Sequence, residues 1–140
     1  MQGTLLALLL AAVFAAIPAA FACGYCVEDK IASVYDHAAV AKALGEKHHT
    51  VYFHVDGPLG KDERTKKAIE AAAASSAGVD RASVHVNVET LTLALAFDPK
   101  RVRLVSLQSE LEKKLARQKL TLMPLRTIEA PGDLAAIHSR

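Results

Sequence analysis

Hydrophobic and polar residues alternate along four stretches of the chain, 50–56, 83–88, 91–97 and 120–128. Alternation predicts a β-strand in each stretch, because successive side chains of a strand point to opposite faces of a sheet. Only Glu89 and Thr90 separate the second stretch from the third, so these two strands are expected to form a hairpin. Pro124 has no backbone N–H, which predicts that the last strand lies at a sheet edge.

Three other stretches place an apolar residue at every third or fourth position, which is the spacing of one helical face. They run over 27–45, 61–77 and 104–118, and Gly45 and Gly78 end the first two. In the first helix, the face that we expect to be buried consists of Val27, Ile31, Val34, Ala38 and Ala41. In the last helix, it consists of Leu104, Leu107, Leu111 and Leu115.

The elements from Thr50 to Ile128 follow the order strand, helix, strand, strand, helix, strand. This order predicts an α+β fold, the ferredoxin-like βαββαβ sandwich, preceded by an extra N-terminal helix. The sandwich domain would span 50–129, with the extra helix in 23–49 and a loosely held tail in 130–140. Because the two later helices are expected to pack on one face of the sheet, the first helix is available to cover the other face.

The N-terminal residues indicate export. Residues 1–22 contain no Asp, Glu, Lys, Arg or His, and their apolar run is followed by Pro18 and by Ala20-Phe21-Ala22, a small-x-small pattern that signal peptidase accepts. We therefore expect a signal peptide that is cut after Ala22, and a periplasmic or secreted mature chain without a stable membrane span. An uncut membrane anchor and a lipid attached to Cys23 are the alternatives, which Pro18 and the bulky Phe21 disfavour.

The composition narrows the classes of partner. The chain has 140 residues, of which 51% are hydrophobic and 5% aromatic, so it holds one small domain at most. Its 17 Lys and Arg residues and 15 Asp and Glu residues leave a formal charge of +2. Polyanion binding needs a concentration of basic residues, so nucleic acid is not an expected partner. No motif joins Ser, His and Asp residues into a hydrolytic site, and we do not expect an enzyme.

Both cysteines lie at the start of the expected mature chain, in Cys23-Gly24-Tyr25-Cys26. Two thiols at this spacing reach one centre where a turn leads into a helix. The positive end of the helix that follows Cys26 favours a thiolate, and Glu28 and Asp29 oppose that effect. The pair is suited to a soft metal ion, to disulfide exchange or to a closed structural disulfide, and the spacing alone does not choose among the three.

Three segments of the predicted sandwich carry a recognisable pattern: Val51-Tyr52-Phe53-His54-Val55-Asp56-Gly57, Gly78-Val79-Asp80-Arg81-Ala82-Ser83-Val84 and Phe97-Asp98-Pro99. They resemble the heavy-metal-associated domain of copper chaperones and metal-transporting ATPases, and the resemblance implies a ferredoxin-like fold. Such domains carry a metal-binding C-x-x-C in the loop after the first strand. Here that loop reads Pro58-Leu59-Gly60-Lys61-Asp62 and has no Cys, so the metal site of the family does not carry over. Cys23 and Cys26 on the extra helix are the candidate replacement.

Soft thiolates favour Cu(I), whereas Zn(II) would require two further ligands. His37 lies eleven residues beyond Cys26, which is roughly 16 Å along a continuous helix. His54 and His85 point away from the two later helices but are expected two strands apart, roughly 10 Å. Docking of the first helix on the sheet is the arrangement that would bring either of them toward the thiols. His48 and His49 are expected to be solvated in a loop, with folding back toward the thiols as the alternative, and the sequence fixes no position for His138 in the tail.

The sequence therefore predicts a small exported protein that binds or delivers Cu(I), or another soft metal ion, through Cys23 and Cys26, with a protein partner for metal transfer. One alternative is a ferredoxin-like partner-binding module with a structural disulfide. The other is a periplasmic thiol–disulfide exchange protein, because Cys23-Gly24-Tyr25-Cys26 resembles the active tetrapeptide of thioredoxin-like proteins. That motif follows a strand in a βαβ unit, and no strand is predicted before Cys23.

Overall fold

The computed structural model describes residues 26–134. Its elements are α1 (Val27–Ala32), α2 (His37–Gly45), β1 (His49–Asp56), α3 (Glu63–Ala74), β2 (Val79–Asn87), β3 (Thr92–Phe97), α4 (Leu104–Lys114) and β4 (Thr121–Ile128). Short 3-10 helices, Ala116–Gln118 and Pro131–Leu134, flank β4. The expected signal peptide, Cys23 and the last six residues lie outside the described residues.

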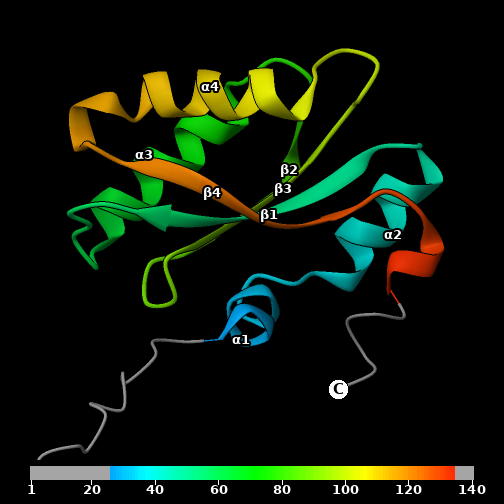
Figure 1. Cartoon of the computed structure of the whole chain (residues 1–140), viewed down its shortest axis with the longest axis horizontal. Helices are drawn as coiled ribbons and strands as arrows, with labels where there is room; N and C mark the ends of the chain where they lie inside the picture. The colour runs from blue at the N-terminus through cyan, green and yellow to red at the C-terminus, as the bar shows by residue number, and fades with distance from the viewer. Residues whose placement is uncertain (1–25, 135–140) are drawn as a thin grey trace, which may run out of the picture.

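The four strands form one antiparallel sheet in the order β2-β3-β1-β4. Helices α3 and α4 cover one face of this sheet, and α1 and α2 lie against the other (Figure 1). The α+β class is thus confirmed, and the arrangement is compatible with the ferredoxin-like sandwich expected from the sequence. Strand β4 lies at an edge, as Pro124 predicts, and its pairing with β1 shifts by one residue beside this proline.

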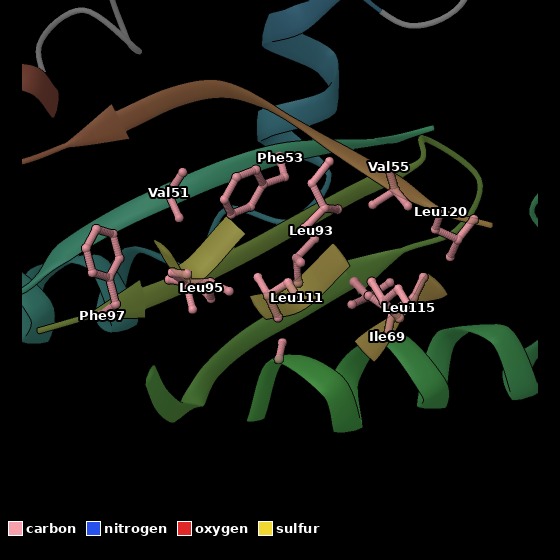
Figure 2. Packing of buried hydrophobic residues seen from close by; sticks show 14 residues of the cluster. Val51, Phe53, Val55, Ile69, Leu93, Leu95, Phe97, Leu111, Leu115 and Leu120 are labelled. Atoms are coloured by element: carbon pink, nitrogen blue, oxygen red, sulfur yellow. The ribbon is translucent and has the colours of Figure 1, made fainter. Parts of the chain in front are cut away.

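The main core fills the space between the sheet and the helices α3 and α4 (Figure 2). Its largest members, all buried, are Phe53, Ile69, Leu93, Leu95, Phe97, Leu107, Leu111 and Leu115. Each buried Leu or Phe side chain contributes about 1.5–3 kcal/mol relative to an exposed one. The leucine face predicted for the last helix is confirmed at Leu107, Leu111 and Leu115.

The single N-terminal helix predicted over 27–45 is wrong, because the structure divides it into α1 and α2. Asp36 has extended backbone angles, and its Oδ1 atom accepts a hydrogen bond from the N–H of Ala39 at 3.1 Å. An aspartate that caps a helix in this way starts a new helix instead of continuing the previous one. The break also changes the helical phase, so Ala38 and Ala41 are exposed and Val40 and Ala43 are buried.

We call residues 27–45 the cover segment, because they close the second face of the sheet. Ile31, Val34 and Val40 form a buried cluster with Tyr52, Ala94 and Ile128. This packing confirms that the N-terminal residues cover that face through Ile31 and Val34. The side chain of Val27, which we expected to be buried, is 38% exposed.

Other boundaries also differ from those that the sequence predicts, and α3 and α4 are both shorter than the predicted helices 61–77 and 104–118. Leu91, expected in a strand, lies in the β2–β3 turn with a φ of 55°. Strand β2 begins at Val79, earlier than predicted, and its pairing with β3 is irregular between Asp80 and His85. The start of the expected loose tail is ordered, because Asp133 accepts two backbone hydrogen bonds there and Leu134 packs against the buried cluster on the second face of the sheet.

Candidate functional site

Cys26 lies at the N-terminal end of α1 and is exposed to solvent. Its Sγ atom donates a hydrogen bond to Asp29 Oδ2 at 3.1 Å. Helix α1 has only six residues, about one and a half turns, so it is much shorter than the helix that the sequence predicted after this thiol. Cys23, the other expected ligand, is outside the described residues.

Polar contacts attach α1 firmly to the sheet. Lys30 Nζ donates to the backbone oxygen of Thr90 at 2.6 Å and lies 3.3 Å from His54 Nδ1. On the other side of the helix, Glu28 Oε1 pairs with Arg126 Nη2 at 3.3 Å. Burial lowers the pKa of Lys30, because removal of the ammonium from water disfavours its charged form. The helix that follows Cys26 is therefore held against β1, β4 and the β2–β3 turn.

The structure separates the two histidines that the sequence put on the second face. His54 is on β1, with its Nδ1 atom 3.1 Å from the backbone oxygen of Leu91. His85 is on β2, with its Nε2 atom 3.4 Å from Asp36 Oδ2. Strand β3 lies between β1 and β2, which confirms the expectation that the two residues are two strands apart. His54 reaches α1 through Lys30, whereas His85 reaches the start of α2.

His48 lies in the loop between α2 and β1, as predicted, but it is half-buried, and the prediction of a solvated loop residue is wrong for His49. His49 is the first residue of β1, and its ring packs edge-on against Phe97 with ring centres 5.7 Å apart. His48 Nδ1 lies 3.5 Å from Glu46 Oε2. The side chains of His48 and His49 are only 24% and 27% exposed, so both have structural contacts. His138 lies outside the described residues.

Within residues 26–134, no group of three or more His, Cys, Asp and Glu side chains is placed to hold a metal ion. Over the same residues, no helix has the length and apolar composition that crossing a membrane requires. Cys26 is thus the one predicted metal ligand whose position can be described.

A second candidate site, which the sequence did not predict, is a hollow of about 450 Å³ at the β2 edge of the sheet. The linker between α1 and α2, helix α3 and strand β2 line it. Its polar lining residues are Ser33, Tyr35, Asp36, His37, Lys66, Glu70 and His85. These residues come from three separate parts of the chain, and the one local signal was the polar run Tyr35-Asp36-His37 inside a predicted helix.

Two polar contacts organise the linker side of this hollow. The N–H of Ala39 donates to Asp36 and holds the pKa of this carboxyl below its ordinary value, so Asp36 is ionised at neutral pH. The hydroxyl of Tyr35 lies 3.2 Å from Nδ1 of His37. The hollow therefore presents carboxylate, imidazole and ammonium groups, which suit a small polar ligand better than an apolar one.

Comparison of the chain with protein-family models, with curated proteins and with solved structures finds no match. The chemistry of the two candidate sites is therefore the basis for inferring a function. The sites are Cys26 at the start of α1 and the polar hollow beside β2.

Proposed function

We propose that this chain is a small exported protein that binds Cu(I) through Cys23 and Cys26. The observation that carries the proposal is that the thiol of Cys26 is exposed at the start of a helix that is attached to the sheet. The other cysteine, Cys23, lies three positions before it in the sequence. Exposure matters because a carrier must pass its ion to a partner through a thiol that the partner can reach. A buried thiol would be inert in such an exchange.

Two thiolates suit Cu(I) because this ion prefers soft sulfur ligands. The thiol of Cys26 is a hydrogen-bond donor to Asp29, so its proton must leave when a metal–sulfur bond forms. Asp29 is the acceptor already in contact with that proton. Zn(II) would require two more ligands than the cysteine pair supplies, which is why we favour Cu(I).

We further propose that the scaffold is a ferredoxin-like sandwich related to the heavy-metal-associated domain. Its support is the strand order β2-β3-β1-β4 together with α3 and α4 on one face. In this proposal, the cover segment supplies the thiols that the loop after the first strand lacks. Residues 1–22 would act as the signal peptide and direct the chain to the periplasm or the exterior, where a protein partner would receive the ion.

The test is a titration of the reduced protein with Cu(I) against a chromophoric chelator that competes for the ion. The variants are Cys23→Ser and Cys26→Ser, each alone and both together. Met123→Leu is the matched control, because Met123 carries the exposed sulfur of β4 and leucine preserves its size. We expect one Cu(I) per chain, loss of at least 100-fold in affinity in either single cysteine variant, and no change in Met123→Leu.

Two other outcomes would overturn the proposal. Equal chelator competition by the protein and by the double cysteine variant would remove the metal site. A disulfide between Cys23 and Cys26 that exchanges rapidly with a dithiol, in a protein that does not retain Cu(I), would identify a thiol–disulfide exchange protein instead.

A further inference from the structure

The hollow beside β2 is a second site, independent of the cysteine pair. Asp36 and His37 line one wall, Lys66 and Glu70 of α3 line the opposite wall, and His85 of β2 lies between the two. Cys26 is not among its lining residues. Whatever this hollow binds is therefore a function beyond the proposed Cu(I) site.

The charged groups on the α3 wall are unpaired. Lys66 and Glu70 are one helical turn apart, a spacing at which opposite charges commonly interact. Among residues 26–134, however, neither side chain forms an ion pair or a hydrogen bond. The order of the two residues explains this result, because a lysine N-terminal to a glutamate is the weaker arrangement on a helix. Both charges remain available to a ligand in the hollow.

Asp36 and His85, which both line the hollow, form a close pair. Asp36 Oδ2 is 3.4 Å from His85 Nε2, which is close enough for charge attraction. Nε2 is nevertheless buried and makes no hydrogen bond within the described part of the chain. A buried polar atom without a partner is uncommon in a folded protein and is expected to have a functional or structural reason.

A tyrosine whose hydroxyl lacks a hydrogen-bond partner among the described residues, Tyr52 of β1, lies in the same row of the sheet as His85, with Ala94 of β3 between them. A second, much smaller space of about 10 Å³ shares Val34, Asp36 and His85 with the hollow and is also lined by Tyr52. Tyr52 is 1% exposed, and its hydroxyl has no hydrogen-bond partner among the described residues. The hollow and this smaller space therefore share Asp36 and His85, and the hollow itself carries one buried atom without a hydrogen-bond partner, His85 Nε2, and two unpaired charges, Lys66 and Glu70.

We propose that the hollow binds a free α-amino acid, with its carboxylate on Lys66 and its ammonium between Asp36 and Glu70. A small anion would meet two carboxylates, and a diamine would meet the Lys66 ammonium, so a zwitterion matches the charges best. Two carboxylates and one ammonium also leave one negative charge over. An amino acid with a cationic side chain, such as lysine, ornithine or arginine, neutralises that charge, and we infer that it is preferred over a neutral amino acid.

The experiment is a titration of the ¹⁵N-labelled protein, followed by NMR, with lysine, arginine, leucine, glutamate, putrescine and the methyl ester of lysine. We expect lysine and arginine to shift the backbone signals of residues 33–37 and of His85, with leucine weaker. Glutamate and putrescine should be the weakest, because the second carboxylate of glutamate would meet Asp36 and Glu70, and putrescine has no carboxylate for Lys66. Lysine methyl ester, which lacks the carboxylate, should lose about tenfold in affinity.

Two pairs of variants on α3 make the test specific. Glu70→Gln preserves the side-chain shape but removes the charge, and Glu63→Gln is its control in the first turn of the same helix. Lys66→Met removes the ammonium but preserves the aliphatic stem, and the exposed Lys67 provides the control Lys67→Met. We expect Glu70→Gln to weaken lysine binding about tenfold and Lys66→Met to abolish the difference between lysine and its methyl ester. Both controls should bind as the unchanged protein does.

The proposal is overturned if no amino acid shifts these signals at millimolar concentration, or if the shifts are the same in Lys66→Met and Glu70→Gln as in the controls. Stronger binding of glutamate or of putrescine than of lysine would also overturn it, because the charge pattern would then be misassigned. The NMR spectrum of each variant shows directly whether it is folded. Cu(I) binding by the cysteines is measured separately, so failure of one proposal does not decide the other.

Discussion

Lys30 and His54 meet on the second face of the sheet, with Nζ and Nδ1 3.3 Å apart. The same Nζ atom donates to the backbone oxygen of Thr90 at 2.6 Å, in the turn between β2 and β3. His54 Nδ1 is also 3.1 Å from the backbone oxygen of Leu91 in that turn. One ammonium group thus joins α1, β1 and the β2–β3 turn, and α1 is the helix that carries Cys26.

Replacement of Lys30 by methionine is expected to loosen the cover segment. Lys30→Met preserves much of the apolar stem but leaves the carbonyl of Thr90 without its ammonium donor. We expect a loss of about 1 kcal/mol in the free energy of unfolding, since the group is partly exposed. Urea unfolding followed by circular dichroism measures this loss. Lys67→Met is the control and should change stability by less than about 0.5 kcal/mol. An equal effect of the two variants would mean that the Lys30 contact contributes nothing.

Ile31→Ala and Leu111→Ala are expected to destabilise different layers of the protein. Ile31 is buried between the cover segment and the sheet, and Leu111 is buried between α4 and the sheet. Each truncation should cost about 2–5 kcal/mol. We also expect Ile31→Ala to speed amide hydrogen exchange in α1 and α2 more than in α3 and α4, because the cover segment can then detach alone. Uniform acceleration throughout the protein would instead show that the two layers unfold as one unit.

Acid should weaken the contact between α2 and β2. Lys42 Nζ lies 2.8 Å from Asp80 Oδ2, and this hydrogen bond is the main cause that lowers the pKa of Asp80 in the folded protein. A carboxyl with a lowered folded pKa stabilises the fold above its unfolded pKa of about 3.9 and loses that contribution as the pH falls further. Asp80→Asn should therefore reduce stability at pH 7 and show a shallower loss of stability below pH 4. Thermal unfolding at a series of pH values tests this expectation, and parallel curves would contradict it.

Tyr52→Phe is expected to preserve or increase stability, which is unusual for a change at a buried residue. The Tyr52 hydroxyl is buried without a hydrogen-bond partner among residues 26–134, and burial raises the pKa of this group well above its ordinary value. Removal of an unsatisfied hydroxyl eliminates a desolvation cost, so the free energy of unfolding should rise by up to about 1 kcal/mol. Denaturant unfolding at pH 7 measures the change. A loss above about 1 kcal/mol would show that the hydroxyl has a stabilising partner.

Local patterns predicted the sheet and the two main helices well. The alternation around Val51, Phe53 and Val55 and the helical spacing of Leu107 and Leu111 are both borne out by burial in the main core. These periods follow from strand and helix geometry, so a short stretch of sequence contains them in full. The break before Asp36 was missed because apolar residues continue at helical spacing across it, whereas the cap depends on a single side-chain contact.

Leu91 illustrates a different failure. It continues the alternation of β3, yet it lies in the turn with positive φ, where its carbonyl accepts from the N–H of Val55. Closure of the hairpin decides that conformation, and a hydrophobic pattern does not encode it. The same distinction applies to the two candidate sites. Cys23 and Cys26 are three positions apart, so the sequence shows them as a pair. The residues that line the hollow are far apart in the chain, so the sequence did not show them as a site: Asp36, Lys66, Glu70 and His85.

The sequence by itself determined the kinds and the order of the elements, the composition of the leucine face of α4, and the chemistry available to a pair of thiols three positions apart. Only the tertiary structure decided that 27–45 forms two helices, that this segment covers the second face through Ile31 and Val34, and that a polar hollow forms beside β2. The physical reason is that periodicity and spacing are properties of neighbouring residues. A site whose walls come from a linker, a helix and an edge strand exists only after those three parts have packed together.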